Sequence, residues 1–146
     1  MKKLSVIGFF LLIGIASNTW AVSCSDDGYS KLNKPDAVSA LSNKRILAVA
    51  PGVGGEEWNE DHCAGGALYK VGDGSVVDPR AFRGTWAVGS GNPALVTYIY
   101  TVGGSSTYEW TLWRNDVGGL CWEGAGSTII ATAPAPVPAG TPCSVP

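Results

Sequence analysis

The densest group of side chains that could carry out chemistry spans residues 56–63, which read Glu-Glu-Trp-Asn-Glu-Asp-His-Cys. In a β-strand, side chains alternate between the two faces, so Glu60 and His62 would share one face with Trp58. A carboxylate beside an imidazole can exchange protons with a substrate, so the pair predicts a hydrolase that uses Glu60 and His62. The alternative, which we favour, is a solvated edge strand whose charges prevent pairing with other chains.

Other catalytic, metal-binding and nucleotide-binding patterns are not found in the sequence. His62 is the single histidine, and Ser90 is interpreted as part of a turn because no predicted helix follows it. The cysteines form no C-x-x-C pair for zinc, and Asp73 and Asp78 offer too few oxygen ligands for a calcium loop. The glycines in residues 52–55 lack the lysine and the helix of a phosphate-binding loop. We therefore expect a protein that is not an enzyme, with no metal and no cofactor.

Aromatic side chains are numerous for so short a chain, and most of them are expected to fill the core, because each can bury about 150–250 Å². The tryptophans and tyrosines of the predicted β domain are Trp58, Trp86, Trp110, Trp113, Trp122, Tyr69, Tyr98, Tyr100 and Tyr108. Trp113 is the best candidate for a ligand contact, because it lies on the otherwise polar face of its predicted strand. Trp58 and Tyr69 follow. We predict that these three form a pocket or platform on which a sugar ring or a flat apolar group stacks.

The cysteines are even in number, at positions 24, 63, 121 and 143. An even number of cysteines in an exported chain predicts two disulfides, and four cysteines allow three connectivities. We prefer Cys121 with Cys143, which would attach the C-terminal tail, and Cys24 with Cys63, which would anchor the N-terminal arm. Each disulfide would contribute on the order of 3 kcal/mol.

The first 21 residues are interpreted as a secretory signal peptide, because Lys2 and Lys3 precede an apolar run that ends in small residues. That run is about ten residues long, short of the roughly 20 that a membrane-spanning helix needs. We therefore predict a periplasmic or secreted protein without a transmembrane segment. A minority alternative is a lipid anchor on Cys24, since residues 21–24 weakly match the motif that precedes a lipid-modified cysteine.

Composition indicates one folded domain. Hydrophobic residues make up 45% of the chain, charged residues make up 15%, and the formal net charge is -2. The basic residues are scattered and form no stripe that could neutralise phosphates, so nucleic acid is excluded as an expected partner. We divide the mature chain into an N-terminal arm with a short helix (22–44), a β domain (45–132) and a tail rich in proline and alanine (133–146).

Local patterns then place the elements. Asn33 and Asp36 predict the N-terminal cap of a helix over 35–41, with Pro35 in its first turn. From residue 45 onward, glycine-bearing turns recur about every 8 to 12 residues, which is typical of antiparallel all-β domains. The predicted strands are 45–50, 57–62, 67–71, 83–88, 95–101, 107–114, 120–123 and 128–132. Proline cannot donate to a strand ladder, so the sheet is expected to end near Thr132.

Two of these strands alternate clearly, which predicts one face in the core and one face in water. Val96, Tyr98 and Tyr100 share a face in one strand, and Trp110 and Leu112 share a face in the next. Eight short strands must hide their edges, and an up-and-down meander that closes into a small barrel removes the edges altogether. A two-sheet sandwich is the alternative fold.

The segment Arg83-Gly84-Thr85-Trp86 resembles the glycine-x-tryptophan signature of lipocalin-like (calycin) barrels. In that family the motif opens the first strand, whereas three predicted strands precede it here. The resemblance implies a barrel that holds a small ligand.

Three hypotheses for function follow. The first is an exported, non-catalytic binding protein that holds a small apolar or glycan ligand through aromatic side chains near one mouth of a barrel. The second is a protein-interaction module of the cell envelope, such as an inhibitor or adhesin, which docks on a protein partner through the arm or the tail. The third is a hydrolase built on Glu60 and His62.

Overall fold

The computed structural model describes residues 23–50, 56–72, 78–124 and 126–146. The predicted signal peptide, the glycines in 52–55 and the Asp73 position therefore lie outside the described residues. One short helix, α1 (Lys34–Leu41), accompanies the strands. The strands are β1 (Ser30–Lys31), β2 (Lys44–Ala50), β3 (Glu56–His62), β4 (Ala67–Lys70), β5 (Ala81–Val88), β6 (Leu95–Tyr100), β7 (Ser106–Arg114), β8 (Leu120–Gly124), β9 (Ser127–Ala131) and β10 (Ala135–Pro136).

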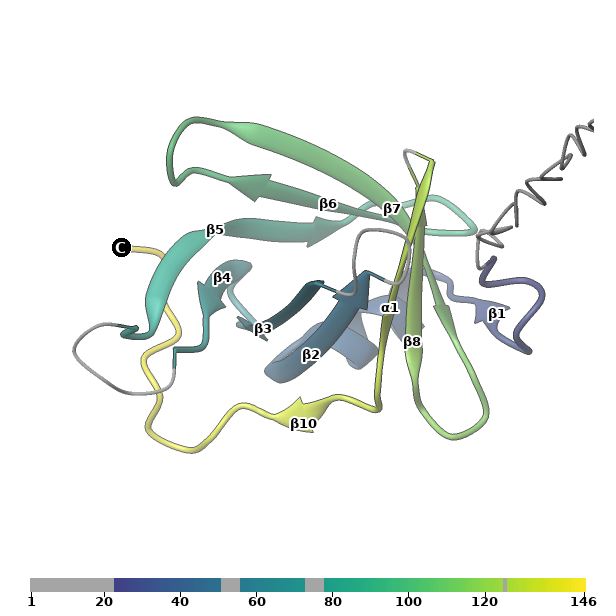
Figure 1. Ribbon diagram of the computed structural model, residues 1–146, viewed down its shortest axis with the longest axis horizontal. Coiled ribbons are helices and arrows are strands. Elements are labelled where there is room, and N and C mark those ends of the chain that lie inside the picture. Colours follow the sequence, from purple (N-terminus) through teal and green to yellow (C-terminus); the bar gives the residue numbers. More distant parts are fainter. Residues whose placement is uncertain (1–22, 51–55, 73–77, 125) are drawn as a thin grey trace, which may run out of the picture.

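Strands β2 to β9 form a closed antiparallel barrel of eight strands (Figure 1). Each strand pairs with the next one along the chain, and β9 returns to pair with β2 through Ala48 with Ala131 and Val49 with Ile130. This confirms the predicted all-β meander and barrel over the sandwich. Because β3 lies between β2 and β4, the interpretation of residues 56–63 as a solvated edge strand is wrong.

The barrel interior is filled by the inward face of each strand. Alternation turns Ile46 and Ala48 of β2, Leu68 of β4 and Trp86 of β5 inward, where they are buried. Tyr98 from β6, Trp110 and Leu112 from β7, and Leu120 and Trp122 from β8 complete this core. As a result, tryptophan and tyrosine side chains occupy much of the space that a ligand would need.

Helix α1 closes one end of the barrel. Asn33 caps the helix, since its side-chain oxygen accepts a hydrogen bond from the backbone N–H of Asp36 at 3.0 Å, which confirms the predicted cap. Ala37, Ala40 and Leu41 are buried and belong to the barrel core. The helix therefore buries its small apolar face at this end of the barrel, whereas no helix among the described residues covers the opposite end.

At that opposite end, the β6–β7 hairpin extends beyond the rest of the barrel wall (Figure 1). Strand β7 pairs with β6 from Ser106 to Thr111, but its ladder with β8 begins only at Thr111. The inward face of this hairpin consequently continues past the rim, and Tyr108 is 45% exposed there. We call this end of the barrel the open mouth.

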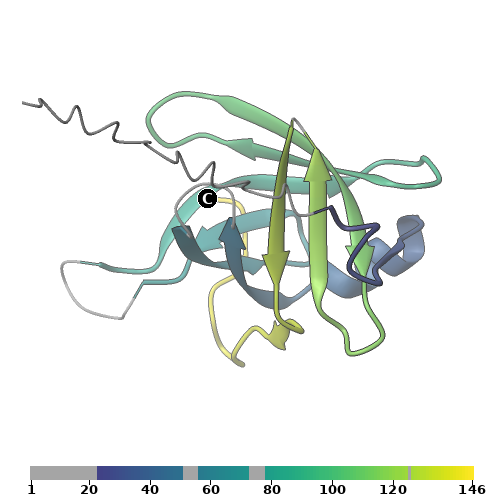
Figure 2. The same ribbon diagram turned by 45° about the vertical axis from the view of Figure 1, so that its right-hand side comes forward.

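The chain before and after the barrel is fastened to its outer surface (Figure 2). Strand β1 pairs with β7, and β10 pairs with β2, although neither strand was expected from the sequence. The disulfides join Cys24 to Cys121 and Cys63 to Cys143. The prediction of two disulfides is confirmed, but the preferred pairing was wrong, because the fold brings the end of β3 to the tail and β8 to the arm. The Cys24 sulfur is occupied by its disulfide, which also contradicts the lipid-anchor alternative.

Candidate functional site

The open mouth contains a cleft of about 650 Å³. It is lined by residues of β2 to β6 and of the connections beside them, with Val102 from the projecting hairpin, and it extends to Leu47 and Glu57 on the outer face of the strands. Its aromatic and charged side chains include Trp58, Glu60, Lys70, Arg83 and Tyr100. We refer to this hollow as the mouth cleft. Its volume falls within the range of about 300–1,000 Å³ that is usual for small-molecule sites.

Glu60 lies at the base of the mouth cleft and is only 8% exposed. The Tyr100 hydroxyl lies 3.2 Å from each of its carboxylate oxygens and donates to them. Burial raises the pKa of Glu60 to about 7, against the opposing effects of the Tyr100 hydrogen bond and the positive charge of Arg83. Burial, together with the negative charge of Glu60, also raises the pKa of the Tyr100 hydroxyl. This carboxyl group can therefore gain or lose a proton near neutral pH.

Arg83 reaches the mouth cleft because of a β-bulge. The ladder between β4 and β5 pairs Leu68 with Gly84 but Tyr69 with Phe82, so Arg83 is the extra residue of β5. Simple alternation from Gly84 and Trp86 would turn Arg83 outward, and the bulge redirects it. Bulges next to binding sites commonly re-aim one side chain in this way.

His62 lies deeper in the barrel than Glu60 and has a separate set of partners. Its Nε2 is 3.1 Å from the Tyr98 hydroxyl oxygen, which accepts a hydrogen bond from Trp122 Nε1 at 2.9 Å. The Tyr98 hydroxyl thus links His62 to Trp122. Burial lowers the pKa of His62 to about 3, in keeping with a neutral ring. Among the described residues, His62 Nδ1 has no hydrogen-bond partner.

Glu60 and His62 therefore share the inward face with Trp58, as alternation predicts, but each is held by its own tyrosine. No hydrogen bond joins the two side chains within the described residues. The space among Trp58, Glu60, His62 and the core aromatic residues is about 40 Å³, enough for about one water molecule. A substrate could not reach both groups at once in this arrangement. Hydrolysis by this pair stays a prediction.

Trp58 is the predicted site residue that lines the mouth cleft. Trp113 lies on the outer face of β7, where it is 8% exposed and packs with Cys24, Cys121 and Tyr29. The ammonium of Lys31 lies 4.8 Å from the centre of its ring. The N-terminal arm thus covers Trp113, which explains why a tryptophan stands on an otherwise polar face.

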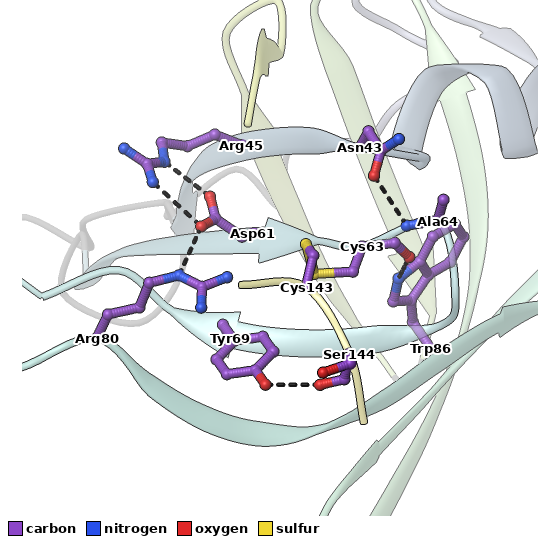
Figure 3. Close-up of a disulfide and its surroundings, with 10 residues drawn as sticks. All are labelled: Asn43, Arg45, Asp61, Cys63, Ala64, Tyr69, Arg80, Trp86, Cys143 and Ser144. Atoms are coloured by element: carbon purple, nitrogen blue, oxygen red, sulfur yellow. Dashed lines mark hydrogen bonds and ion pairs between the residues drawn. A yellow bond between two sulfur atoms is a disulfide. The ribbon is translucent and has the colours of Figure 1, made fainter. Parts of the chain in front are cut away.

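Tyr69 also lies outside the barrel, beside the C-terminal tail (Figure 3). Its hydroxyl donates to the Ser144 carbonyl at 2.6 Å, and the Arg80 guanidinium carbon lies 3.8 Å from the centre of its ring. The structure does not bring the three predicted ligand residues together. Ligand contact by Trp113 and Tyr69 stays a prediction.

A buried charge cluster next to Tyr69 was not expected from the sequence (Figure 3). Asp61 is fully buried, and its carboxylate accepts hydrogen bonds from Arg45 at 2.7 and 3.1 Å and from Arg80 at 2.9 Å. Burial alone would raise the pKa of Asp61, but these bonds and the two positive charges lower it overall. Both carboxylate oxygens of Asp61 accept hydrogen bonds from protein groups. The cluster is therefore a structural cross-link between β2, β3 and the β4–β5 connection.

Lys70, Arg83 and Tyr100 are among the residues of the mouth cleft that were not predicted as site residues. The alternation of β6 already placed Tyr100 on the same face as Tyr98, and this pattern could have identified Tyr100 as an inward-facing residue. Lys70 lies directly opposite Glu60 in the β3–β4 ladder, a relation that sequence cannot provide without the register.

Within the parts of the chain that the structure describes, no group of three or more histidine, cysteine or acidic side chains is arranged to hold a metal ion. No helix in those parts is long and apolar enough to span a membrane. Comparison of the chain with protein-family models, with curated proteins and with solved structures finds no match.

Proposed function

We propose that this protein is an exported, non-catalytic binding protein that holds a glycan in the mouth cleft, with a sugar ring packed on Trp58. The observation that carries the proposal is the contrast between the two hollows of the barrel. The mouth cleft measures about 650 Å³, whereas the interior space measures about 40 Å³. A ligand must therefore sit at the rim.

The lining of the mouth cleft favours a sugar over an apolar ligand. Trp58 and Tyr100 supply aromatic surface, while Glu60, Lys70 and Arg83 supply hydrogen-bonding groups beside it. A sugar ring has this same combination, since its C–H faces pack on aromatic rings and its hydroxyl groups need polar partners. A purely apolar ligand would leave the charged groups desolvated and unpaired, at a cost in free energy.

Two further features are consistent with the proposal. The resemblance of Gly84-Thr85-Trp86 to the lipocalin-like signature implies ligand binding at a barrel mouth, although here the motif lies in the fourth barrel strand. The two disulfides are typical of an oxidising compartment outside the cytoplasm, and we infer that the protein is periplasmic or secreted.

The protein-interaction alternative loses much of its original support. Both segments expected to dock on a partner are held on the barrel, the arm by β1 and Cys24 and the tail by β10 and Cys143. Removal of residues 134–146 would therefore disturb the barrel itself. The alternative remains a prediction.

The proposal is tested by titrating the protein with a panel of neutral and acidic oligosaccharides. Isothermal calorimetry and tryptophan emission measure the binding. We expect at least one oligosaccharide to bind, and Trp58→Ala to weaken its binding at least tenfold. Tyr69→Ala is the matched control, because this aromatic side chain lies outside the mouth cleft, and we expect it to retain binding. If no oligosaccharide binds, or if Trp58→Ala and Tyr69→Ala behave alike, the proposal is wrong.

A further inference from the structure

The charged side chains of the mouth cleft are not all paired. Lys70 and Asp78 form an ion pair with each other, and Glu60 accepts hydrogen bonds from Tyr100. Glu57 is exposed at the rim. Among the described residues, the Arg83 guanidinium takes part in no ion pair and no side-chain hydrogen bond. Within the described parts of the chain, Arg83 is thus the cation of the mouth cleft that has no acidic partner.

The surroundings of Arg83 suit a ligand in which a carboxylate lies next to a ring. Trp58 and Tyr100 line the same hollow, and Glu60 lies beneath them, close enough for its titration to respond to the charge of Arg83. Glu60 and Arg83 nevertheless form no ion pair with each other. A planar guanidinium binds a carboxylate through two parallel hydrogen bonds, and it does so best where water is partly excluded.

We propose that the ligand is an acidic glycan, whose carboxylate is bound by Arg83 while the adjoining sugar ring packs on Trp58. This inference rests on the proposed function and specifies its ligand class. A neutral sugar would leave the guanidinium without an anionic partner. The cleft also carries the carboxyl groups of Glu57 and Asp78, so its lining as a whole does not repel a cation, and a cationic oligosaccharide is therefore one of the probes.

Ligand binding at Arg83 also has a consequence for Glu60. A ligand carboxylate near Arg83 would place a second negative charge close to the buried Glu60 carboxyl group. The titratable or charged groups that face Glu60 are Lys70, Arg83, Tyr100, Tyr98 and His62. Of these, His62 is neutral and Lys70 is already paired, so the ligand and Glu60 would compete for the positive charge of Arg83. Glu60, whose pKa is about 7, is then expected to bind a proton when the acidic ligand binds.

The proposal is tested with trigalacturonic acid and its methyl-esterified counterpart, two probes with the same rings that differ in charge. Isothermal calorimetry at pH 5.5 and pH 7.5, in buffers of different ionisation enthalpy, measures both affinity and proton uptake. We expect the acid to bind at least tenfold more tightly than the ester at pH 5.5. We expect the affinity for the acid to decrease at pH 7.5, and the affinity for the ester to stay constant.

Two variants and a control assign the effect to residues. Arg83→Gln should remove the preference for the acid and leave binding of the ester within about twofold, whereas Arg83→Lys should restore part of the preference. Glu60→Gln should abolish both the pH dependence and the proton uptake. Arg114→Gln removes the same charge from an exposed site at the closed end of the barrel and should change nothing.

The outcomes separate the two proposals. Equal binding of acid and ester, with no effect of Arg83→Gln, would overturn the acidic-glycan inference while leaving glycan binding at Trp58 intact. Binding of neither probe, together with no binding across the wider panel, would overturn the proposed function itself. Tighter binding of the ester or of a cationic oligosaccharide would also contradict the inference.

Discussion

Two buried titratable groups give the folded state opposing responses to pH. Burial raises the pKa of Glu60 from its ordinary value of 4.5 to about 7. The stability that this shift provides is fully present below pH 4.5 and is lost as the pH rises through 7. Burial lowers the pKa of His62 from 6.5 to about 3, so its contribution is present above pH 6.5 and is lost as the pH falls through 3. Between pH 4.5 and 6.5 the two groups change the free energy of unfolding with pH in opposite directions, and their effects cancel.

We therefore predict that Glu60→Gln changes the shape of the stability profile. The wild type should show a plateau of unfolding free energy between about pH 4.5 and 6.5, with losses on either side. In Glu60→Gln the free energy of unfolding should keep rising up to pH 6.5. The difference in unfolding free energy, variant minus wild type, should be about 3 kcal/mol more positive at pH 8 than at pH 4. Urea unfolding at pH 4, 5.5 and 8, followed by tryptophan emission, measures this. Glu57→Gln, at an exposed neighbour, serves as the control, and parallel profiles for Glu60→Gln and the wild type would contradict the prediction.

Gly84 is a position on β5 where a side chain is not tolerated. Its φ is 154°, and an added Cβ atom would lie 1.9 Å from the Ile99 carbonyl oxygen on β6. Since that neighbour is backbone inside the barrel wall, the strands must separate to make room. We predict that Gly84→Ala destabilises the protein by about 3 kcal/mol. Gly65→Ala is the control, because an added Cβ atom there meets nothing within 4 Å. Thermal unfolding of both variants measures the difference, and equal melting temperatures would refute the account.

At the same scale, sequence could predict part of the candidate site. Strict alternation in one strand was sufficient to place Trp58, Glu60 and His62 on a common face. Alternation could not find Arg83, because its orientation depends on a bulge that exists only when β4 and β5 are paired. It also suggested an exposed Trp113, because the arm that covers this side chain is joined by contacts distant in sequence.

At the scale of elements, the helix and the eight barrel strands were predictable because each carries its own local signal. Glycine turns, alternation and the Asn33 cap all act within a few residues. The strands β1 and β10 were not predictable, since polar residues and proline give no alternation in them. The disulfide connectivity was missed for the same reason. Which cysteines meet depends on the order of strands around the barrel, and the connection after β3 lies beside the tail only once that barrel is closed.

The two disulfides should contribute similarly to stability but report on different elements. They close separations of 80 residues (Cys63 to Cys143) and 97 residues (Cys24 to Cys121), so loss of either should lower the free energy of unfolding by about 4 kcal/mol. Replacing Cys63 and Cys143 by alanine should release the tail to proteolysis and leave Trp113 emission unchanged. Replacing Cys24 and Cys121 should shift Trp113 emission, because the arm that buries this ring is released. Limited proteolysis and emission spectra check both, and a released arm in the first variant would contradict the assignment.

At the scale of the whole molecule, an eight-strand barrel has an interior that side chains can just fill. In this chain the filling is done largely by aromatic rings, including Trp86, Trp110 and Trp122, and α1 seals the closed end. The remaining space of about 40 Å³ cannot hold a drug-sized molecule. Filling the interior makes the barrel rigid and moves any binding surface to the rim, where the β6–β7 hairpin and the bulge of β5 shape the mouth cleft.

A filled interior predicts that the wild type takes up no apolar ligand, whereas a core truncation creates such a site. Trp110 is 8% exposed and belongs to the main core cluster, so Trp110→Ala should cost about 3–5 kcal/mol and leave a cavity among apolar and aromatic neighbours. Such cavities stay dry and bind benzene or xenon. Benzene should then raise the melting temperature of Trp110→Ala but not of the wild type. Tyr108→Ala, two residues away on the same face but 45% exposed, should create no cavity and show no benzene effect. Stabilisation of the wild type by benzene would mean that the barrel is hollow, and would return the binding site from the rim to the interior.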